Sequence, residues 1–197
     1  MEKRLVSAFA VPFVLSFAMS GQIQAATVIG FEGGADPLFT YSGVDFVNTP
    51  VSDVSGYNNV AAFTGSTWVA FNTLEATPSS FFISGSPAIT FTLHSLVISG
   101  AWGSQTLTVE GFNNGSLLFS STLDISLTSK TFSPGWTGID ELRISTGSDF
   151  VDDPTATGIG THWALDNLTI TPIPEPKVYA MLLAGLGLLG FMARRKE

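Results

Sequence analysis

The chain contains no cysteine, which excludes disulfide bonds, thiolate metal sites and cysteine nucleophiles. Charge is also scarce, because only 12% of the residues are charged. Between Thr27 and Ile173 the only basic residues are Lys130 and Arg143, against 13 acidic residues. Such an acidic surface repels the phosphates of nucleic acids and of anionic lipids, so we expect no nucleic acid among the partners.

Motifs that carry catalysis are equally rare. The chain has two histidines, His94 and His162, and lacks the HExxH, Gly-x-Ser-x-Gly and P-loop patterns. His94 alternates with Leu93, which predicts a solvent-facing position on a strand. We therefore predict that the protein is not an enzyme and needs no organic cofactor. A small hydrolase is a third alternative, because a glycosidase needs only two suitably spaced carboxylates.

Residues 1–26 have the three-part layout of a secretory signal peptide. Lys3 and Arg4 precede the uncharged, mostly apolar run 5–19, and a polar stretch then ends in small residues. We predict export by the secretion machinery and cleavage by signal peptidase after Ala25 or Ala26. The alternative is an N-terminal helix kept in the fold, although the run is short for a membrane span.

The C-terminal end repeats this logic in reverse order. Residues 172–177 are a proline-rich spacer, and since proline fixes its own φ and lacks an amide donor, neither a strand nor a helix is expected to continue through it. Residues 178–193 are uncharged and apolar, and a basic cluster follows at once. We predict a single transmembrane helix and its basic stop over residues 178–197, with the basic end cytoplasmic and the domain outside. A buried core helix, the alternative, leaves the basic end unexplained.

Three features therefore occur in a fixed order at the C-terminus: a Pro-Glu-Pro tripeptide, an apolar span and a basic stop. The residues concerned are Pro174, Glu175, Pro176, Arg194, Arg195 and Lys196. This arrangement closely resembles the PEP-CTERM sorting signal of Gram-negative bacteria. The resemblance implies that an exosortase, a membrane-embedded enzyme similar to cysteine proteases, cuts near the tripeptide. It also implies export across the inner membrane, a transient membrane anchor, and a final place at the cell surface or outside the cell.

Between the two ends, residues 27–171 are predicted to form one all-β domain. Short runs of apolar, Thr and aromatic residues recur between clusters of Gly, Pro, Asn and Ser, without a long stretch at helical spacing. This pattern is typical of an antiparallel β-sandwich, and the number of strands favours a jelly roll. The predicted strands are 28–32, 44–47, 60–64, 67–71, 80–83, 89–98, 105–112, 116–123, 130–132, 139–145 and 162–171.

The clearest local pattern is a hairpin centred on Asn114-Gly115. Apolar and polar residues alternate on both sides of this pair, at 105–112 and 116–123. Asn-Gly suits the positive φ angles of a two-residue hairpin turn. We therefore expect these two strands to be antiparallel neighbours.

One carboxylate is predicted to point inward if the face that it shares with its neighbours is the core. Residues two apart on a strand share a face, so Asp166 should point the same way as Ala164, Leu168 and Ile170. A buried charge must be paired, strongly hydrogen-bonded or metal-bound. The first and last strands of a jelly roll commonly lie side by side, which would make Glu32 and Asp166 two oxygen ligands of a calcium ion. The alternative is an Asp that is hydrogen-bonded to a neighbouring turn or paired with Arg143.

Two short motifs add a second resemblance. The Gly-Phe-Glu opening at 30–32 and the Leu-Asp-Asn-Leu strand at 165–168 are similar to those of carbohydrate-binding modules with a jelly-roll fold. The resemblance implies a structural calcium ion between the terminal strands. A second acidic cluster, Asp149, Asp152 and Asp153, lacks the spacing of an EF-hand and is interpreted as a solvated loop, with a weak calcium site as the alternative.

Two tryptophans are candidates for stacking on sugars. Trp102 and Trp136 are flanked by glycines and are predicted to lie in loops, where binding residues concentrate. The alternative is core packing, which is the usual place of tryptophan. Exposed rings would favour a carbohydrate-binding module, and buried rings a matrix component.

Together these features predict an exported surface or extracellular-matrix protein that is sorted by an exosortase. We expect a non-enzymatic structural or adhesive role in exopolysaccharide or biofilm matrix. The alternative is a calcium-stabilised carbohydrate-binding module with exopolysaccharide as its partner.

Overall fold

The computed structural model describes residues 25–32, 40–41, 44–54, 66–72, 78–83, 89–173 and 176–194. The predicted signal peptide therefore lies outside the described residues, except for Ala25 and Ala26. The elements are β1 (Thr27–Ile29), β2 (Thr40–Tyr41), β3 (Val44–Val47), β4 (Val51–Asp53), β5 (Trp68–Phe71), β6 (Ser79–Ile83), β7 (Phe91–Gly100), β8 (Gly103–Asn113), β9 (Ser116–Ile125), β10 (Lys130–Phe132), β11 (Trp136–Ile139), β12 (Glu141–Ser145), β13 (Val151–Asp152), β14 (Trp163–Pro172) and α2 (Pro176–Arg194).

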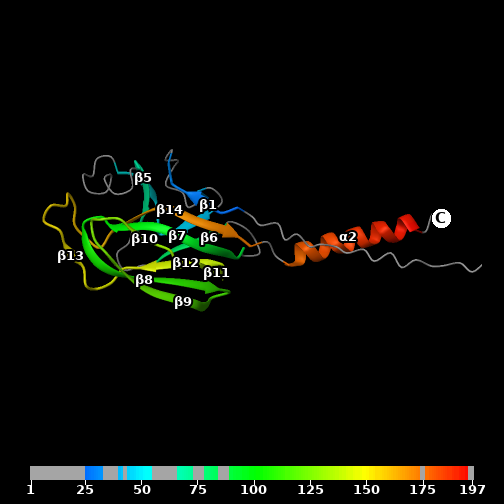
Figure 1. Cartoon of the computed structure of the whole chain (residues 1–197). Coiled ribbons are helices and arrows are strands. Elements are labelled where there is room, and N and C mark those ends of the chain that lie inside the picture. The colour runs from blue at the N-terminus through cyan, green and yellow to red at the C-terminus, as the bar shows by residue number, and fades with distance from the viewer. Residues whose placement is uncertain are drawn as a thin grey trace, which may run out of the picture.

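The strands form two antiparallel sheets that pack face to face, as predicted (Figure 1). The first, sheet A, has the order β10-β7-β14-β5-β4, with β1 also paired to β14 and β11 to β7. The second, sheet B, has the order β13-β8-β12-β6-β3-β2, with β9 paired to β8. The first and last strands of the sandwich, β1 and β14, are neighbours, as expected for a jelly roll. The predicted all-β sandwich is therefore confirmed.

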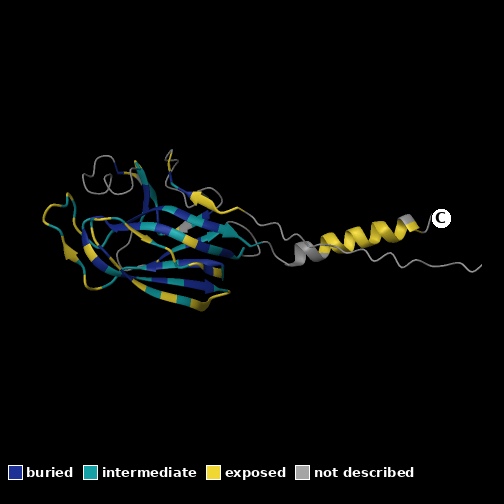
Figure 2. Ribbon diagram, viewed as in Figure 1, coloured by how far each residue is buried: buried dark blue, intermediate teal, exposed yellow. Residues whose placement is uncertain are grey.

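The main apolar core lies between the sheets and explains the alternation of the sequence. Alternate residues of β8 and β12 point into it, including Leu107, Val109, Leu142 and Ile144, while their neighbours point outward (Figure 2). Trp163 is fully buried and lies 6.4 Å from Phe81, measured between ring centroids.

A second, smaller apolar cluster lies apart from the main core. It contains Val54, Val69, Ala101 and Ala164. Ala164 belongs to it, whereas its neighbours Trp163 and Leu165 belong to the main core, so this cluster lies on the outer face of sheet A.

The predicted hairpin is confirmed. β8 and β9 pair from Asn113 and Ser116 back to Gln105 and Ile125. Asn114 has φ of 48° and Gly115 has φ of 72°, which are the positive angles that the Asn-Gly turn requires.

One predicted strand is in fact two. The segment 139–145 is divided at Asp140, because Ile139 pairs with Phe91 in sheet A and Glu141 pairs with Phe112 in sheet B. The chain therefore crosses from one sheet to the other at a single residue. The Asp140 carboxylate accepts a hydrogen bond of 2.8 Å from the amide of Asn114, which ties this crossing to the hairpin turn. Prediction from sequence missed the short strands β2, β4, β11 and β13, and the predicted strand 60–64 lies outside the described residues.

The predicted spacer begins two residues too early. Pro172 is the last residue of β14, where it pairs with Phe91, and the amide of Ile173 donates a 2.7 Å hydrogen bond to the carbonyl of Thr90. Pro176 is the first residue of α2. Proline is tolerated at both places, because the amide it lacks is not needed at the end of a strand or at the start of a helix.

Candidate functional site

The terminal strands bring a buried carboxylate against a glycine. β1 pairs with β14 so that Ile29 lies opposite Leu168, and Gly30 follows beside Asp166. A methyl group on Gly30 would lie 3.8 Å from Oδ1 of Asp166 and 3.6 Å from Oδ1 of Asn167. Two side-chain oxygens therefore lie beside one point next to the Gly30 backbone, at ordinary van der Waals distance from a methyl group placed there.

Asp166 is 1% exposed, as predicted, but it lies on a different face from the one expected. Leu165 and Leu168 both belong to the main core, although they are three residues apart. The register shifts between Asp166 and Thr169, and Asn167 has φ of 49°. The resulting β-bulge changes the alternation, so Asp166 shares a face with Ala164 and not with Leu168 and Ile170. The prediction that these residues share one face is wrong for this reason.

Each of the two predicted calcium ligands accepts a hydrogen bond from another group of the protein. Oδ1 of Asp166 accepts a 2.7 Å hydrogen bond from the amide of Asn167. Glu32 accepts a hydrogen bond from the hydroxyl of Ser66 and faces solvent. The suggested pairing of Asp166 with Arg143 is wrong, because Arg143 forms its ion pair with Glu141.

Calcium binding at this place stays a prediction. Within the described ranges, no group of three or more His, Asp or Glu side chains is arranged to hold a metal ion. Calcium also takes amide and backbone oxygens, and the Asn167 oxygen beside Asp166 is of that kind. The residues present therefore fit a calcium ion in the chemistry of their oxygens.

The two candidate tryptophans differ in their surroundings. Trp102 lies in the bend between β7 and β8, as predicted, and is half-buried. A methyl group on Gly158 would lie 2.7 Å from its ring, so the 158 backbone covers one face of the indole. The carbonyl of Trp102 also accepts a 2.9 Å hydrogen bond from the amide of Asp153.

Trp136 does not lie in a loop, which corrects the prediction, because it is the first residue of β11. It is 9% exposed. Phe119 stacks on it with centroids 5.3 Å apart, and Phe132 meets its ring edge-on at 5.6 Å. One ring face is thus occupied by a neighbour, and glycines on both sides of a tryptophan were a misleading indication of a loop.

Two residues of the acidic cluster, Asp149 and Asp153, accept hydrogen bonds that fix the conformation of their segment. Asp149 accepts hydrogen bonds from the amide and the hydroxyl of Thr106, and these bonds lower the pKa of its carboxyl group. Asp153 accepts from the hydroxyl and the amide of Thr155, which also lowers its pKa. The segment is exposed, as interpreted, but it is not a loop throughout, because Asp152 lies in the short strand β13, which pairs with β8.

The histidines lie apart in different surroundings. His94 is exposed on β7, as predicted, and its Nε2 lies 2.8 Å from the hydroxyl of Thr171. His162 is half-buried, with Nδ1 2.9 Å from the carbonyl of Asn72.

A polar cluster that was missed in the sequence lies on the outer face of sheet B. Oε1 of Glu141 accepts hydrogen bonds from Nε of Arg143 at 3.0 Å, from Nη2 at 2.9 Å and from the hydroxyl of Ser80 at 2.7 Å. The guanidinium carbon of Arg143 lies 4.2 Å from the centroid of the Phe112 ring. The alternation Glu141-Leu142-Arg143 in the predicted strand was the pattern that could have revealed it.

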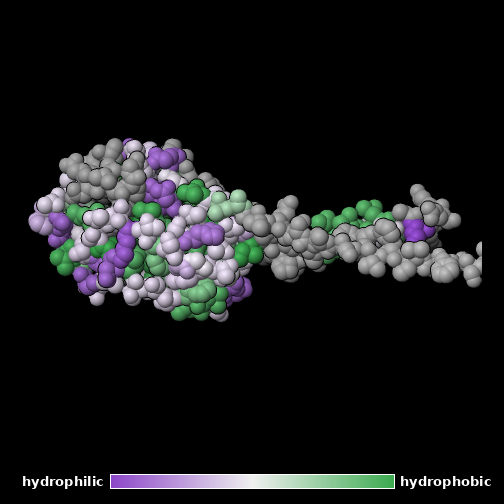
Figure 3. Space-filling view, in the orientation of Figure 1, coloured by the Kyte–Doolittle hydropathy of each residue, from purple (hydrophilic) through white to green (hydrophobic). Residues whose placement is uncertain are grey.

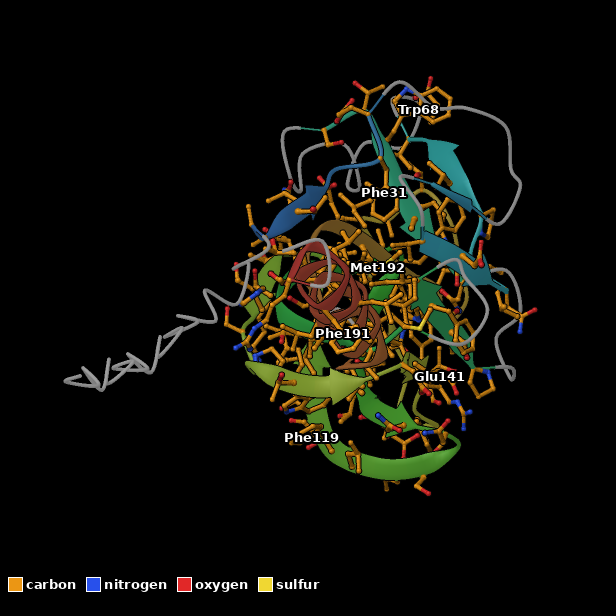
Figure 4. All side chains as sticks on the ribbon, turned by 90° about the vertical axis from the view of Figure 1, so that its right-hand side faces the viewer. Phe31, Trp68, Phe119, Glu141, Phe191 and Met192 are labelled. Atoms are coloured by element: carbon orange, nitrogen blue, oxygen red, sulfur yellow. The ribbon has the colours of Figure 1, made fainter. Side chains whose placement is uncertain are left out.

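This outer face continues across neighbouring strands. In register, Ser120, Glu110, Arg143 and Ser80 form one row across β9, β8, β12 and β6. Figure 4 shows Glu141 and Phe119 in the half of the molecule formed by sheet B, with Phe31 and Trp68 in the other half. The row presents hydroxyl, carboxylate and guanidinium groups, which can bind hydroxyl-rich ligands through hydrogen bonds.

The sorting segment forms the helix α2. Its apolar residues from Met181 to Met192 are exposed on all sides and form a largely hydrophobic surface outside the sandwich (Figure 3). Arg194 is its last residue, while Pro174, Glu175, Arg195 and Lys196 lie outside the described residues. No helix in the described part of the chain has both the length and the hydropathy needed to cross a membrane. The predicted transmembrane span is therefore not confirmed.

Comparison with known families identifies this segment. Residues 172–196 match the PEP-CTERM protein-sorting motif, so the resemblance stated from the sequence is confirmed. The motif indicates a secreted protein that is sorted at the surface of Gram-negative bacteria. No curated protein matches the chain.

Among solved structures, the sandwich is similar at low sequence identity to an agarase, a carbohydrate-binding module and an adhesin domain. An exo-beta-agarase is 13% identical with a TM-score of 0.46, over 77% of this chain and 25% of that chain. A family 29 carbohydrate-binding module is 15% identical with a TM-score of 0.42, over 76% and 92%. The K2 adhesin domain of Lys-gingipain is 8% identical with a TM-score of 0.45, over 75% and 98%. The chain thus spans only a quarter of the agarase. Similarity at this distance supports no conclusion about a ligand.

Proposed function

We propose that this chain is exported across the inner membrane and sorted by an exosortase to the cell surface or the extracellular matrix. There, the β-sandwich has a non-enzymatic structural or adhesive role in exopolysaccharide or biofilm matrix. The observation that carries the proposal is the sorting motif at 172–196, which begins where the last strand of the sandwich ends. The partners are the secretion machinery, signal peptidase and the exosortase.

The exposed helix supports a transient anchor. Between Lys177 and Arg194 the sequence of α2 carries no charge, and its described side chains are exposed on every side. Such a surface is unfavourable in water and must be covered by lipid or by another protein. We infer that α2 is held at the membrane until the sorting enzyme removes it.

The test uses the full chain with an epitope in the sandwich, expressed in a bacterium that has an exosortase. We expect a shortened form in the outer-membrane or extracellular fraction. Replacing Pro174 and Glu175 together by Ala should leave the uncut form in the inner-membrane fraction. Pro172→Ala is the matched control, because Pro172 belongs to β14 and precedes the tripeptide. Unchanged processing of the Pro174/Glu175 variant would contradict the proposal.

A second candidate function is a calcium-stabilised carbohydrate-binding module. It is favoured by the polar outer face of sheet B, where Glu141, Arg143 and Ser80 are already held together by hydrogen bonds. Groups that are fixed before binding lose little entropy when a polysaccharide hydroxyl replaces water. Trp102 contributes at most one open ring face, and Trp136 is stacked against Phe119.

The test for this candidate is retention on the exopolysaccharide of the producing strain. We expect Arg143→Ala to abolish retention and Trp136→Phe to leave it unchanged, because Trp136 is 9% exposed. Retention that survives Arg143→Ala would exclude this face.

The calcium ion is tested by thermal unfolding in millimolar calcium and in chelator. A ligand that binds only the folded form raises the midpoint temperature of unfolding. At a ligand concentration a hundredfold above Kd, it adds about 2.7 kcal/mol to the free energy of unfolding. We expect Asp166→Asn or Glu32→Gln to abolish the rise. Gly30→Ala should also abolish it, because the added methyl group occupies the point beside which the Asp166 and Asn167 oxygens lie. Equal midpoint temperatures with and without calcium in the unmodified protein would show that the folded protein does not bind calcium.

A further inference from the structure

β9 is the exposed edge of sheet B. It runs for 10 residues and, among the described strands, pairs only with β8 (Figure 1). Its sequence, SLLFSSTLDI, has one charged residue, Asp124, and no Pro, Gly, Lys or Arg. Leu117 and Leu118 are 52% and 49% exposed. A long edge strand with little charge presents a row of peptide groups to which another strand can pair.

The other edges of the sandwich carry the features that prevent such pairing. On the same side of the molecule, the edge of sheet A is divided into β10 and β11 by Pro134 and Gly135, and it carries Lys130. The edge strands β2 and β13 have two residues each, and β4 has three. Short length, proline and lysine are the usual protections of an edge. Among the described edges, β9 lacks all of these protections.

The direction of the β9 peptide groups follows from β8. The amide of Thr106 donates to Asp149 and therefore points away from β9, and Thr106 lies opposite Asp124 in the register. In an antiparallel pair, two facing residues either both point their amide and carbonyl groups toward the partner strand or both point them away. These two kinds of residue pair alternate along the strands. The peptide groups of Asp124, Thr122 and Ser120 therefore point outward.

Contacts at the carbonyl groups agree with this assignment. The carbonyl of Asp124 accepts a 3.2 Å hydrogen bond from Nζ of Lys130, which covers that end of the edge. The carbonyl of Thr122 has only a long contact, 3.4 Å, from the hydroxyl of Ser121. The part of the edge best suited to pairing is therefore the stretch from Ser120 to Thr122.

We propose that β9 pairs with β9 of a second copy of this chain, antiparallel and with a two-fold axis at Ser121. This register places Ser120 opposite Thr122 of the second copy, so that the outward amides and carbonyls of both residues bond reciprocally. It places the two Asp124 carboxylates at opposite ends of the contact. Between residues 27 and 173 the chain has 13 acidic and two basic residues, and only one of the acidic residues, Asp124, lies in β9, so this strand is where two copies are expected to repel each other least.

The contact is expected to be weak in dilute solution. A pair of single strands buries less than the roughly 1,600 Å² of a standard stable interface. Display of many copies on one surface raises their local concentration and compensates for this weakness. The inference thus rests on the proposed surface role and names its partner, a second copy of the same chain.

The test is disulfide cross-linking of the full chain. Because the chain contains no cysteine, only an introduced cysteine can form the cross-link. Residues that face each other across a two-fold axis in an antiparallel pair have Cα atoms about 4.5 to 5.5 Å apart, within reach of a disulfide. We expect Ser121→Cys to give a disulfide-linked dimer on intact cells with diamide as oxidant, and the same dimer from the purified full chain in detergent at high concentration. Thr131→Cys, on the protected neighbouring edge β10, should give none.

Two further variants identify the strand pairing. Thr122→Pro removes an outward amide that β8 does not use and should abolish cross-linking of Ser121→Cys, whereas Thr122→Val keeps the amide and should not. Replacing Ser120 and Thr122 together by Lys should also abolish the dimer, and mixing that protein with the matching Glu pair should restore it. These residues are exposed or half-buried, so the fold tolerates the changes.

Three results would overturn the proposal: equal cross-linking of Thr131→Cys, capture of a different protein by Ser121→Cys, or no rescue in the mixed pair. Cell fractionation distinguishes a failure of the β9 pairing from a failure of the proposed surface sorting. A dimer of the purified chain together with a wrong cellular location would refute surface sorting and leave the pairing intact.

Discussion

The Glu141–Arg143 pair offers a test of how strongly the outer face of sheet B is organised. Oε1 of Glu141 accepts three hydrogen bonds, and the two side chains are 11% and 34% exposed. Exposed ion pairs contribute about 0.2 to 1 kcal/mol, and breaking buried ones costs about 3 to 5 kcal/mol. Because Arg143 keeps a third of its side chain in water, we expect a coupling energy of about 1 to 2 kcal/mol between the two residues.

The assay is a double-mutant cycle with Glu141→Ala and Arg143→Ala, measured by urea unfolding of the domain from Thr27 to Ile173. Arg143→Ala alone should lower the free energy of unfolding by about 2 to 3 kcal/mol, since it also removes the stacking of the guanidinium group on Phe112. The matched control is Glu110→Ala, because Glu110 lies opposite Arg143 in the register while the ion pair is formed with Glu141. Its coupling to Arg143 should be below about 0.5 kcal/mol. Equal coupling of Glu110 and Glu141 would refute the assignment of the pair.

Three further predictions concern packing, the chain end and pH. Gly111→Ala should lower the free energy of unfolding by about 1 to 3 kcal/mol, because the added methyl group would lie 2.9 Å from Cγ2 of Ile139. Gly147→Ala should unfold the acidic loop, because its methyl group would lie 2.3 Å from the carbonyl oxygen of Thr106. Thermal unfolding measures both effects. A chain that ends at Thr171 should melt below one that ends at Ile173, since it loses the pairing with Phe91 and Thr90. Asp149 has a lowered pKa in the fold, so its contribution is present above the unfolded value of 3.8 and is lost as pH falls through the lower folded value. Protection of the Thr106 amide from hydrogen exchange, measured relative to the intrinsic exchange rate at each pH, should therefore fall in that acid range, and Asp149→Asn should remove this fall in protection.

The repeated patterns of the sequence were sufficient to predict the sandwich. The β8–β9 hairpin followed from alternation and from Asn114-Gly115, because both effects are local and act in the same direction. The adjacency of β1 and β14 followed from the architecture. These features depend on few residues and on no long-range detail.

The errors arose where tertiary structure changed a local rule. Alternation failed at Asp166, because Asn167 adopts a positive φ that no apolar pattern announces. The crossing at Asp140 was missed, because one residue suffices to change sheets when its carboxylate is held by the hairpin turn. Trp136 was assigned to a loop from its glycine neighbours, whereas its burial depends on the rings of Phe119 in β9 and Phe132 in β10, which the fold brings against it.

The end of the sheet at Ile173 has a consequence for the energetics of maturation. The last strand pair, with β7, and the last backbone hydrogen bond, to Thr90, both lie N-terminal to the Pro-Glu-Pro tripeptide. A cut anywhere after Ile173 therefore removes none of the described strand pairing, so we expect the free energy of folding of the sandwich to be the same before and after release. Processing needs no unfolding and supplies no folding energy, so the mature domain can be complete before the enzyme acts on it.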